Sequence, residues 1–106
     1  MQASDAKPAI VCAVIDETRG ASLVFHGEIV TRNVASGLYR LSIVKGGPAG
    51  SSTIRQGGAF TSRSEQAVMV GGGALSLEPG STYAISLVVE MGGRSIDCAP
   101  ASGKQP

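Results

Sequence analysis

Alternation of apolar and polar residues along most of the chain constrains the fold more than any other feature. In the segment YAISLVVEM, residues 83–91, every second residue is a large apolar one. The segment LYRLSIVK, residues 38–45, alternates in the same way, and its predicted inward side chains are Tyr39, Leu41 and Ile43. Because successive side chains of a β-strand point to opposite faces, both segments are predicted to be half-buried strands.

Five further segments are candidate strands, each bounded by residues that favour turns. They span residues 8–16, 21–32, 51–58, 65–72 and 94–99. Clusters of Gly, Pro, Ser and Asn separate them, and no window combines helical spacing with caps at both ends. About seven short strands at intervals near ten residues predict an all-β fold, namely an antiparallel, immunoglobulin-like β-sandwich.

Two glycine clusters have distinct predicted roles. Gly92 and Gly93 suit a two-residue hairpin turn, which would pair residues 83–91 directly with residues 94–98. The cluster GGG at residues 71–73 invites comparison with a phosphate-binding loop, but neither a helix nor a lysine follows it. We therefore predict that residues 71–73 form a loose turn.

The 106 residues are expected to form one domain around a single core. Aromatic residues make up only 4% and Trp is absent, so Val, Ile, Leu and Ala must supply that core. We expect the sandwich at residues 9–100, a flexible N-terminal segment at 1–8 and a flexible C-terminal tail at 101–106. No stretch approaches the roughly 18 consecutive apolar residues of a membrane-spanning helix, so no membrane partner is expected.

The two cysteines lie near opposite ends of the predicted domain, Cys12 on the first candidate strand and Cys98 on the last. A disulfide between them would stabilise the fold by about 4.5 kcal/mol in the chain-entropy model. Such bridges persist in secreted and periplasmic proteins and are rare in the cytosol. The alternative is a pair of buried thiols that only pack. The cysteines are too far apart in sequence for a Cys-x-x-Cys redox motif.

Residues that catalyse reactions or bind metals are scarce. His26 is the single histidine, and it precedes Glu28 by two residues on the same predicted strand face. One imidazole and one carboxylate do not make a metal site, and no serine lies in a nucleophile-elbow motif. We therefore expect no enzyme, no metal and no cofactor, and we interpret His26 as an exposed or edge residue.

Charge is distributed unevenly although the net charge is only +1. Residues 29–64 contain five basic residues and no acidic residue, whereas residues 65–98 contain four acidic residues and one arginine. By alternation, Arg40 and Arg55 point outward from consecutive strands, and the other three lie at strand ends or in turns. A basic sheet face would attract an acidic partner. The candidate contacts are Arg32, Arg40, Lys45, Arg55 and Arg63.

Other interpretations of these charges remain open. The same residues would also protect strand edges from aggregation as solvated charges. Nucleic acid is not expected as a partner, because only two Tyr and two Phe are present for base stacking and the net charge is weakly basic.

Beyond these patterns, the chain resembles the curli assembly inhibitor family of the CsgC and CsgH type. The resemblance covers roughly residues 9–100 and is carried by SGLYRLSIVKGGPAGSSTIRQGG and ALSLEPGSTYAISLVVEMGGRS. The cysteines near both ends are similar to the CsgH branch, found in alphaproteobacteria. CsgC-type members carry Cys-x-Cys where this chain has Gly-Leu-Tyr at residues 37–39, so the resemblance implies no thiol-exchange role.

The resemblance implies a periplasmic β-sandwich that keeps the curli major subunit from premature amyloid assembly. By the same resemblance, that subunit is a disordered, acidic, Gln/Asn-rich chain that assembles through cross-β pairing. A monomer making transient electrostatic contact through its basic face fits this role. The main alternative is an adhesive or structural sandwich module that pairs through strand edges. A third possibility is an enzyme inhibitor that presents the loop KGGPAGSS.

Overall fold

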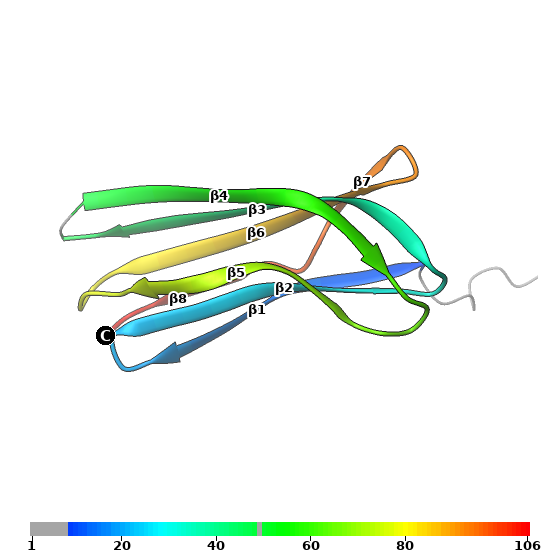
Figure 1. The fold of residues 1–106 in the computed structure, drawn as a ribbon. Coiled ribbons are helices and arrows are strands. Elements are labelled where there is room, and N and C mark those ends of the chain that lie inside the picture. Colours follow the sequence, from blue (N-terminus) through cyan, green and yellow to red (C-terminus); the bar gives the residue numbers. More distant parts are fainter. Residues whose placement is uncertain (1–8, 49) are drawn as a thin grey trace, which may run out of the picture.

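The computed structural model describes residues 9–48 and 50–106, which form two antiparallel β-sheets packed face to face (Figure 1). The strands are β1 (Ile10–Arg19), β2 (Ser22–Thr31), β3 (Ala35–Gly47), β4 (Gly50–Ser62), β5 (Val68–Ser76), β6 (Thr82–Met91), β7 (Arg94–Asp97) and β8 (Ala101–Lys104). Strands β1, β2 and β5 form a three-stranded sheet. The five-stranded sheet has the order β4-β3-β6-β7, and β8 also pairs with β6. The predicted all-β sandwich is confirmed.

The structure has one strand more than the sequence predicted. Strand β8 lies where we expected a flexible tail, with Ala101 paired to Ile85 and Lys104 to Thr82. This four-residue segment, ASGK, is too short and too polar for alternation to identify it as a strand. The predicted N-terminal segment at residues 1–8 lies outside the described residues. Over the described part of the chain, no helix is long and apolar enough to cross a membrane.

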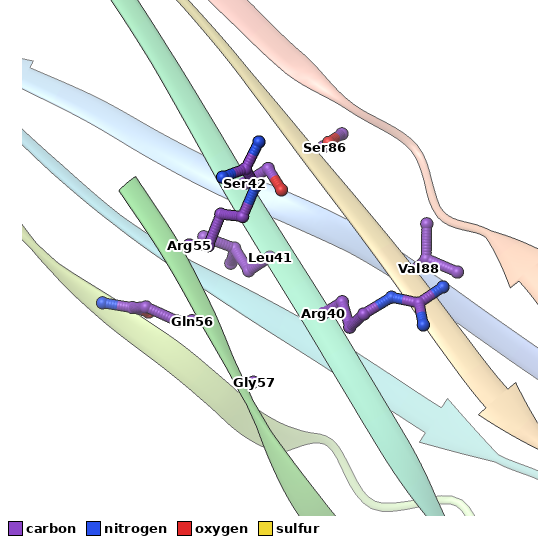
Figure 2. A pocket seen from close by; sticks show the side chains of 8 residues that line it. All are labelled: Arg40, Leu41, Ser42, Arg55, Gln56, Gly57, Ser86 and Val88. Atoms are coloured by element: carbon purple, nitrogen blue, oxygen red, sulfur yellow. The ribbon is translucent and has the colours of Figure 1, made fainter. Parts of the chain in front are cut away.

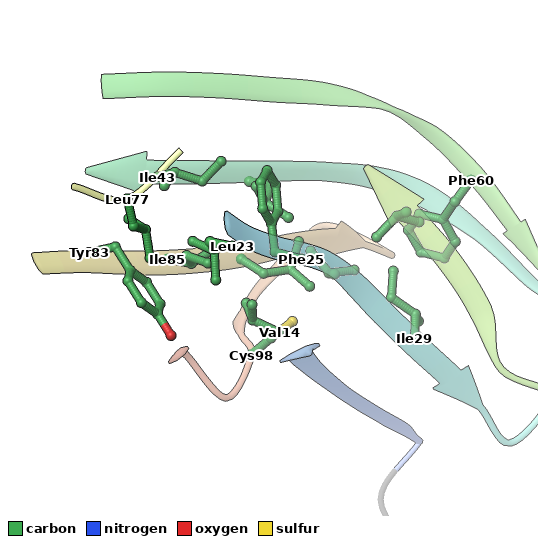
Figure 3. Packing of buried hydrophobic residues seen from close by; sticks show 14 residues of the cluster. Val14, Leu23, Phe25, Ile29, Ile43, Phe60, Leu77, Tyr83, Ile85 and Cys98 are labelled. Carbon is green, nitrogen blue, oxygen red and sulfur yellow. The ribbon is translucent and has the colours of Figure 1, made fainter. Parts of the chain in front are cut away.

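The core lies between the two sheets and consists of alternate residues of the central strands (Figure 3). As predicted, inward residues of β6 and β3 are buried: Tyr83, Ile85, Leu87, Val89, Leu41 and Ile43. Tyr39 and Met91 pack partly buried against this cluster. The opposite sheet contributes Leu23, Phe25 and Ile29 of β2. Burial of each large aliphatic side chain stabilises the fold by about 1.5–3 kcal/mol.

A disulfide and a short backbone ladder close one side of the sandwich. The predicted Cys12–Cys98 disulfide is present, which excludes the alternative of two packed thiols. The Cys98 N–H donates to the Leu87 carbonyl at 2.9 Å, which holds the segment to β6. The next residue, Ala99, donates to the Cys12 carbonyl at 3.1 Å and accepts from the Val14 N–H at 2.8 Å. Residues 98 and 99 therefore bridge the two sheets before β8 returns to β6.

The two glycine clusters behave differently. Gly92 and Gly93 form the predicted hairpin turn with φ of 59° and 77°, and Met91 pairs with Arg94. The prediction of a loose turn at residues 71–73 is wrong, because these glycines lie inside β5. The register between β2 and β5 shifts here, and Gly71 and Gly72 have φ of 64° and 129°. They form a β-bulge, in which positive φ favours glycine.

Gln56 of β4 connects the two sheets on the side opposite the disulfide. Its side-chain amide donates to the Gly72 carbonyl at 3.0 Å, and its amide oxygen accepts from the Gly72 N–H at 2.8 Å. This amide thus contacts both backbone groups of Gly72, as a neighbouring strand would. Part of the open edge of β5 is covered in this way.

Candidate functional site

The outer face of the five-stranded sheet is the candidate site, because it brings together two of the predicted basic residues. We define this face as the side chains of the sheet that point away from the core. On β3 and β6 these are Leu38, Arg40, Ser42, Val44, Thr82, Ala84, Ser86, Val88 and Glu90. Most of these side chains are small or of medium size.

Arg40 and Arg55 line one hollow of this face, with a volume of about 400 Å³ (Figure 2). Arg40 is paired with Gly57 and Arg55 with Ser42 across β3 and β4, so the two arginines are diagonal neighbours. Diagonal partners in an antiparallel pair lie about 7–8 Å apart, within reach of the same ligand. Figure 2 shows Arg55 extending toward Ser42 and Arg40 toward Val88.

The two arginines differ in their partners. Nη1 of Arg40 lies 3.0 Å from Oε2 of Glu90, and the two side chains are 64% and 38% exposed. An ion pair this exposed contributes only about 0–1 kcal/mol, so a competing carboxylate can replace Glu90 at little cost. Among the described residues, Arg55 has no ion-pair partner. Arg55 therefore offers the hollow an uncompensated positive charge.

The other three predicted contacts lie elsewhere. Lys45 has the same strand parity as Leu41 and Ile43, and its Nζ lies 3.2 Å from Oε2 of Glu78 with the side chain only 20% exposed. It therefore belongs to the inner side of the sheet.

Arg32 follows β2, and Arg63 follows β4, at the end of the sandwich opposite Lys45. Their segments are joined where the Ser64 hydroxyl donates to the Arg32 carbonyl at 2.6 Å. The five basic residues thus do not form one surface.

Sequence reasoning missed two features of the outer face. Lys104 is the outward partner of Thr82 on β8, and it was missed because residues 101–106 were assigned to a tail.

A second hollow of about 330 Å³ adjoins the first and shares Ser42 and Ser86 with it. Its further lining residues are Val44, Ala84, Ile85, Pro100, Ala101 and Ser102. The signal for it was Val44, an apolar residue at an outward position of a strand.

The outer face is not uniformly positive. Its acidic residues, Glu90 and Asp97, lie on β6 and β7, and Asp97 is the partner of Val88. The basic residues of the hollow lie on β3 and β4. An acidic ligand would therefore be drawn toward the β3–β4 half of the face.

His26 lies outside this face, on the outer side of the three-stranded sheet. Its Nε2 is 3.0 Å from Oε2 of Glu28, and the His26 side chain is 23% exposed. Because β2 lies between β1 and β5, the interpretation of His26 as an exposed or edge residue is wrong. No group of three or more His, Cys, Asp or Glu that could hold a metal ion occurs among the residues described.

Comparisons with known proteins agree with this architecture. Residues 11–101 match the family model of the CsgH protein. The solution structure of R. palustris CsgH is 36% identical, with a TM-score of 0.70, over 84% of this chain and 88% of that chain. The E. coli curli protein CsgC has a TM-score of 0.69 over 92% of this chain and 98% of its own, but at 14% identity it shows the fold alone. No curated protein matches the chain.

Proposed function

The chain belongs to the CsgH family, and on this premise we propose that it is a periplasmic, chaperone-like inhibitor of curli amyloid formation. Family membership supports a curli-associated role, and the Cys12–Cys98 disulfide is consistent with an extracytoplasmic location. The proposed client is the disordered major subunit of curli. The proposed contact is transient and electrostatic, and the inhibitor acts as a monomer.

The hollow between Arg40 and Arg55 is the observation that carries this proposal. A carboxylate of the client would meet the uncompensated charge of Arg55 and compete with Glu90 for Arg40. Because both arginines are exposed, each contact is weak and the client leaves readily. Through repeated capture and release, one inhibitor molecule would contact many client chains during the early stage of assembly. The inhibitor would therefore act at substoichiometric concentration.

Contact through a sheet face also explains why such a protein would inhibit amyloid rather than template it. Backbone groups within a face are already paired to neighbouring strands, so a client lying on the face finds no backbone template. At the sheet margins, Ala99 pairs with β1, and Gln56 covers part of the edge of β5. Side-chain capture is therefore favoured over strand addition at these places.

The direct experiment follows fibril formation of a purified curli major subunit with thioflavin T. This protein is added at a small fraction of the subunit concentration. We expect a lag several times longer than that of the subunit alone, with no nucleotide present. An unchanged lag would overturn the proposed function, and a stable stoichiometric complex or polymer in size-exclusion chromatography would favour an adhesive module instead.

A further inference from the structure

We propose that the outer face selects extended client segments in which a carboxylate and an apolar side chain lie on the same side of the chain. This inference rests on the proposed function and specifies the chemistry that the site recognises. It follows from the two adjoining hollows, one lined by arginines and the other mainly by apolar groups. A purely electrostatic face would need only the first of them.

The two hollows adjoin one another across β3 and β6. Ser42 and Ser86 are paired across these strands, and both residues line both hollows. The small serine side chains form a low boundary between the charged part and the apolar part. A single ligand can therefore occupy both parts at once.

The apolar part is exposed on the outward side of β3 and β6. Val44 is 51% exposed, and its cross-strand partner Ala84 is also exposed. Pro100 and Ala101 complete the hollow beside β6. Covering these groups with an apolar side chain removes nonpolar surface from water, which adds affinity that does not depend on charge.

The spacing of the two parts sets the spacing of the ligand groups. Along β3, Val44 is two residues from Ser42, the partner of Arg55, and four residues from Arg40. Same-side residues of an extended chain repeat at about 6.6–6.8 Å. An extended segment lying along β3 would thus place a carboxylate and an apolar side chain two or four positions apart. Adjacent placement would turn one of them away from the face.

The test uses fluorescently labelled peptides and fluorescence anisotropy. The first peptide carries Asp and Leu two positions apart in a Ser/Asn background, the second replaces Leu with Ser, and the third moves Leu next to Asp. We expect the first peptide to bind at least about threefold more tightly than the other two. Equal affinities for the three peptides would overturn the inference, and this comparison needs no protein variant.

A matched pair of protein variants locates the apolar contact. Val44→Thr with Ala84→Ser makes the apolar hollow polar at nearly constant volume. The control is Val24→Thr with Ala74→Ser, because these residues form the same kind of exposed cross-strand pair on the other sheet. The preference for the first peptide should disappear in the V44T/A84S variant and persist in the control. Its persistence in a folded V44T/A84S protein would contradict the inference.

The peptide results can be separated from those of the proposed function. If the protein prolongs the fibril lag but binds the three peptides equally, the inference fails and the proposed function stands. If it shows the predicted peptide preference but leaves the lag unchanged, the inference stands and the proposed function fails.

Discussion

At the scale of single residues, the outward direction of Arg40 and Arg55 could be predicted from the sequence. Ion pairs between residues far apart in the sequence could not. Alternation around Leu41 places Arg40 on the outer surface, and the same rule applied to β4 places Arg55 there. The ion pair of Lys45 with Glu78 joins residues 33 positions apart, which no local pattern reveals. Parity does identify Lys45 as inward, since it is two residues beyond Ile43.

The first prediction concerns the competition between Glu90 and a client for Arg40. Glu90→Gln should release Arg40 and strengthen inhibition, lengthening the fibril lag at a fixed concentration of the protein by roughly twofold. The control is Glu17→Gln, which removes a carboxylate that is 60% exposed from its ion pair with Arg19 on the other sheet. An equal effect of both variants would indicate net charge rather than Arg40 as the cause.

The second prediction concerns the pH dependence of stability. The hydroxyl of Tyr83 donates to Oδ2 of Asp16 at 2.5 Å, and burial, followed by this hydrogen bond, raises the pKa of Tyr83 to about 12. Above a pH of about 10 the unfolded state loses this proton while the folded state retains it, so stability falls between about pH 10 and 12.

Urea unfolding from pH 7 to 11.5 measures this dependence. Tyr83→Phe should reduce the fall in the free energy of unfolding above pH 10, whereas Tyr39→Phe should leave most of it. At pH 7, Tyr83→Phe should also destabilise the protein by about 1–2 kcal/mol, since Asp16 loses its donor. A parental pH dependence in Tyr83→Phe would refute the role assigned to this hydroxyl.

At the scale of strands, periodicity succeeded where side chains alternate and failed where they do not. Residues 38–45 and 83–91 are parts of β3 and β6, the strands that carry the core and the outer face. Residues 71–73 are glycines, so they cannot show the alternation of apolar and polar side chains that marks a strand. The β-bulge at this place also interrupts the alternation. The second hollow depends on β8, which the sequence does not distinguish from a tail.

The third prediction concerns the covered edge of β5. Gln56→Ala removes both hydrogen bonds to Gly72 and should lower the free energy of unfolding by about 1–2 kcal/mol. It should also increase concentration-dependent self-association, because the freed backbone groups can pair with another strand. Urea unfolding and sedimentation velocity measure the two effects. Gln66→Ala, an exposed glutamine outside the strands, is the control and should change neither.

At the scale of the whole molecule, one covalent link joins the two sheets across a sequence separation of 86 residues. Its existence could be predicted from two cysteines near the ends of the domain. Its position between the sheets could not, because the sequence does not say which strands share a sheet. For the same reason, the sequence could not show whether the five basic residues share a surface.

The fourth prediction concerns this link. Intact-mass analysis with and without reductant should differ by two hydrogens, and neither thiol should react with an alkylating agent before reduction. Reduction should lower the free energy of unfolding by a few kcal/mol, at most about 4.5. Because Cys98 and Cys12 belong to the core side of the sandwich, whereas Arg40 and Arg55 point outward, a folded reduced protein should still prolong the fibril lag. Full alkylation without reductant would show that the bridge is absent.

The last prediction tests capture of an acidic client by the outer face. Arg40→Glu with Arg55→Glu replaces attraction by repulsion on two outward side chains and leaves the core face of β3 unchanged. The control, Arg19→Glu with Arg94→Glu, changes the net charge equally but lies outside the hollow. Circular dichroism should show that both double variants retain the parental β structure.

The decisive measurement is the thioflavin-T lag of the curli subunit with the parent and both double variants, at low and at physiological ionic strength. The R40E/R55E protein should lose most of the delay, and the control should keep it. Added salt should shorten the parental delay, after correction for the subunit alone, because exposed charges are screened beyond about 8 Å at 0.15 M. A folded R40E/R55E protein that delays fibrils as long as the parent would contradict this account.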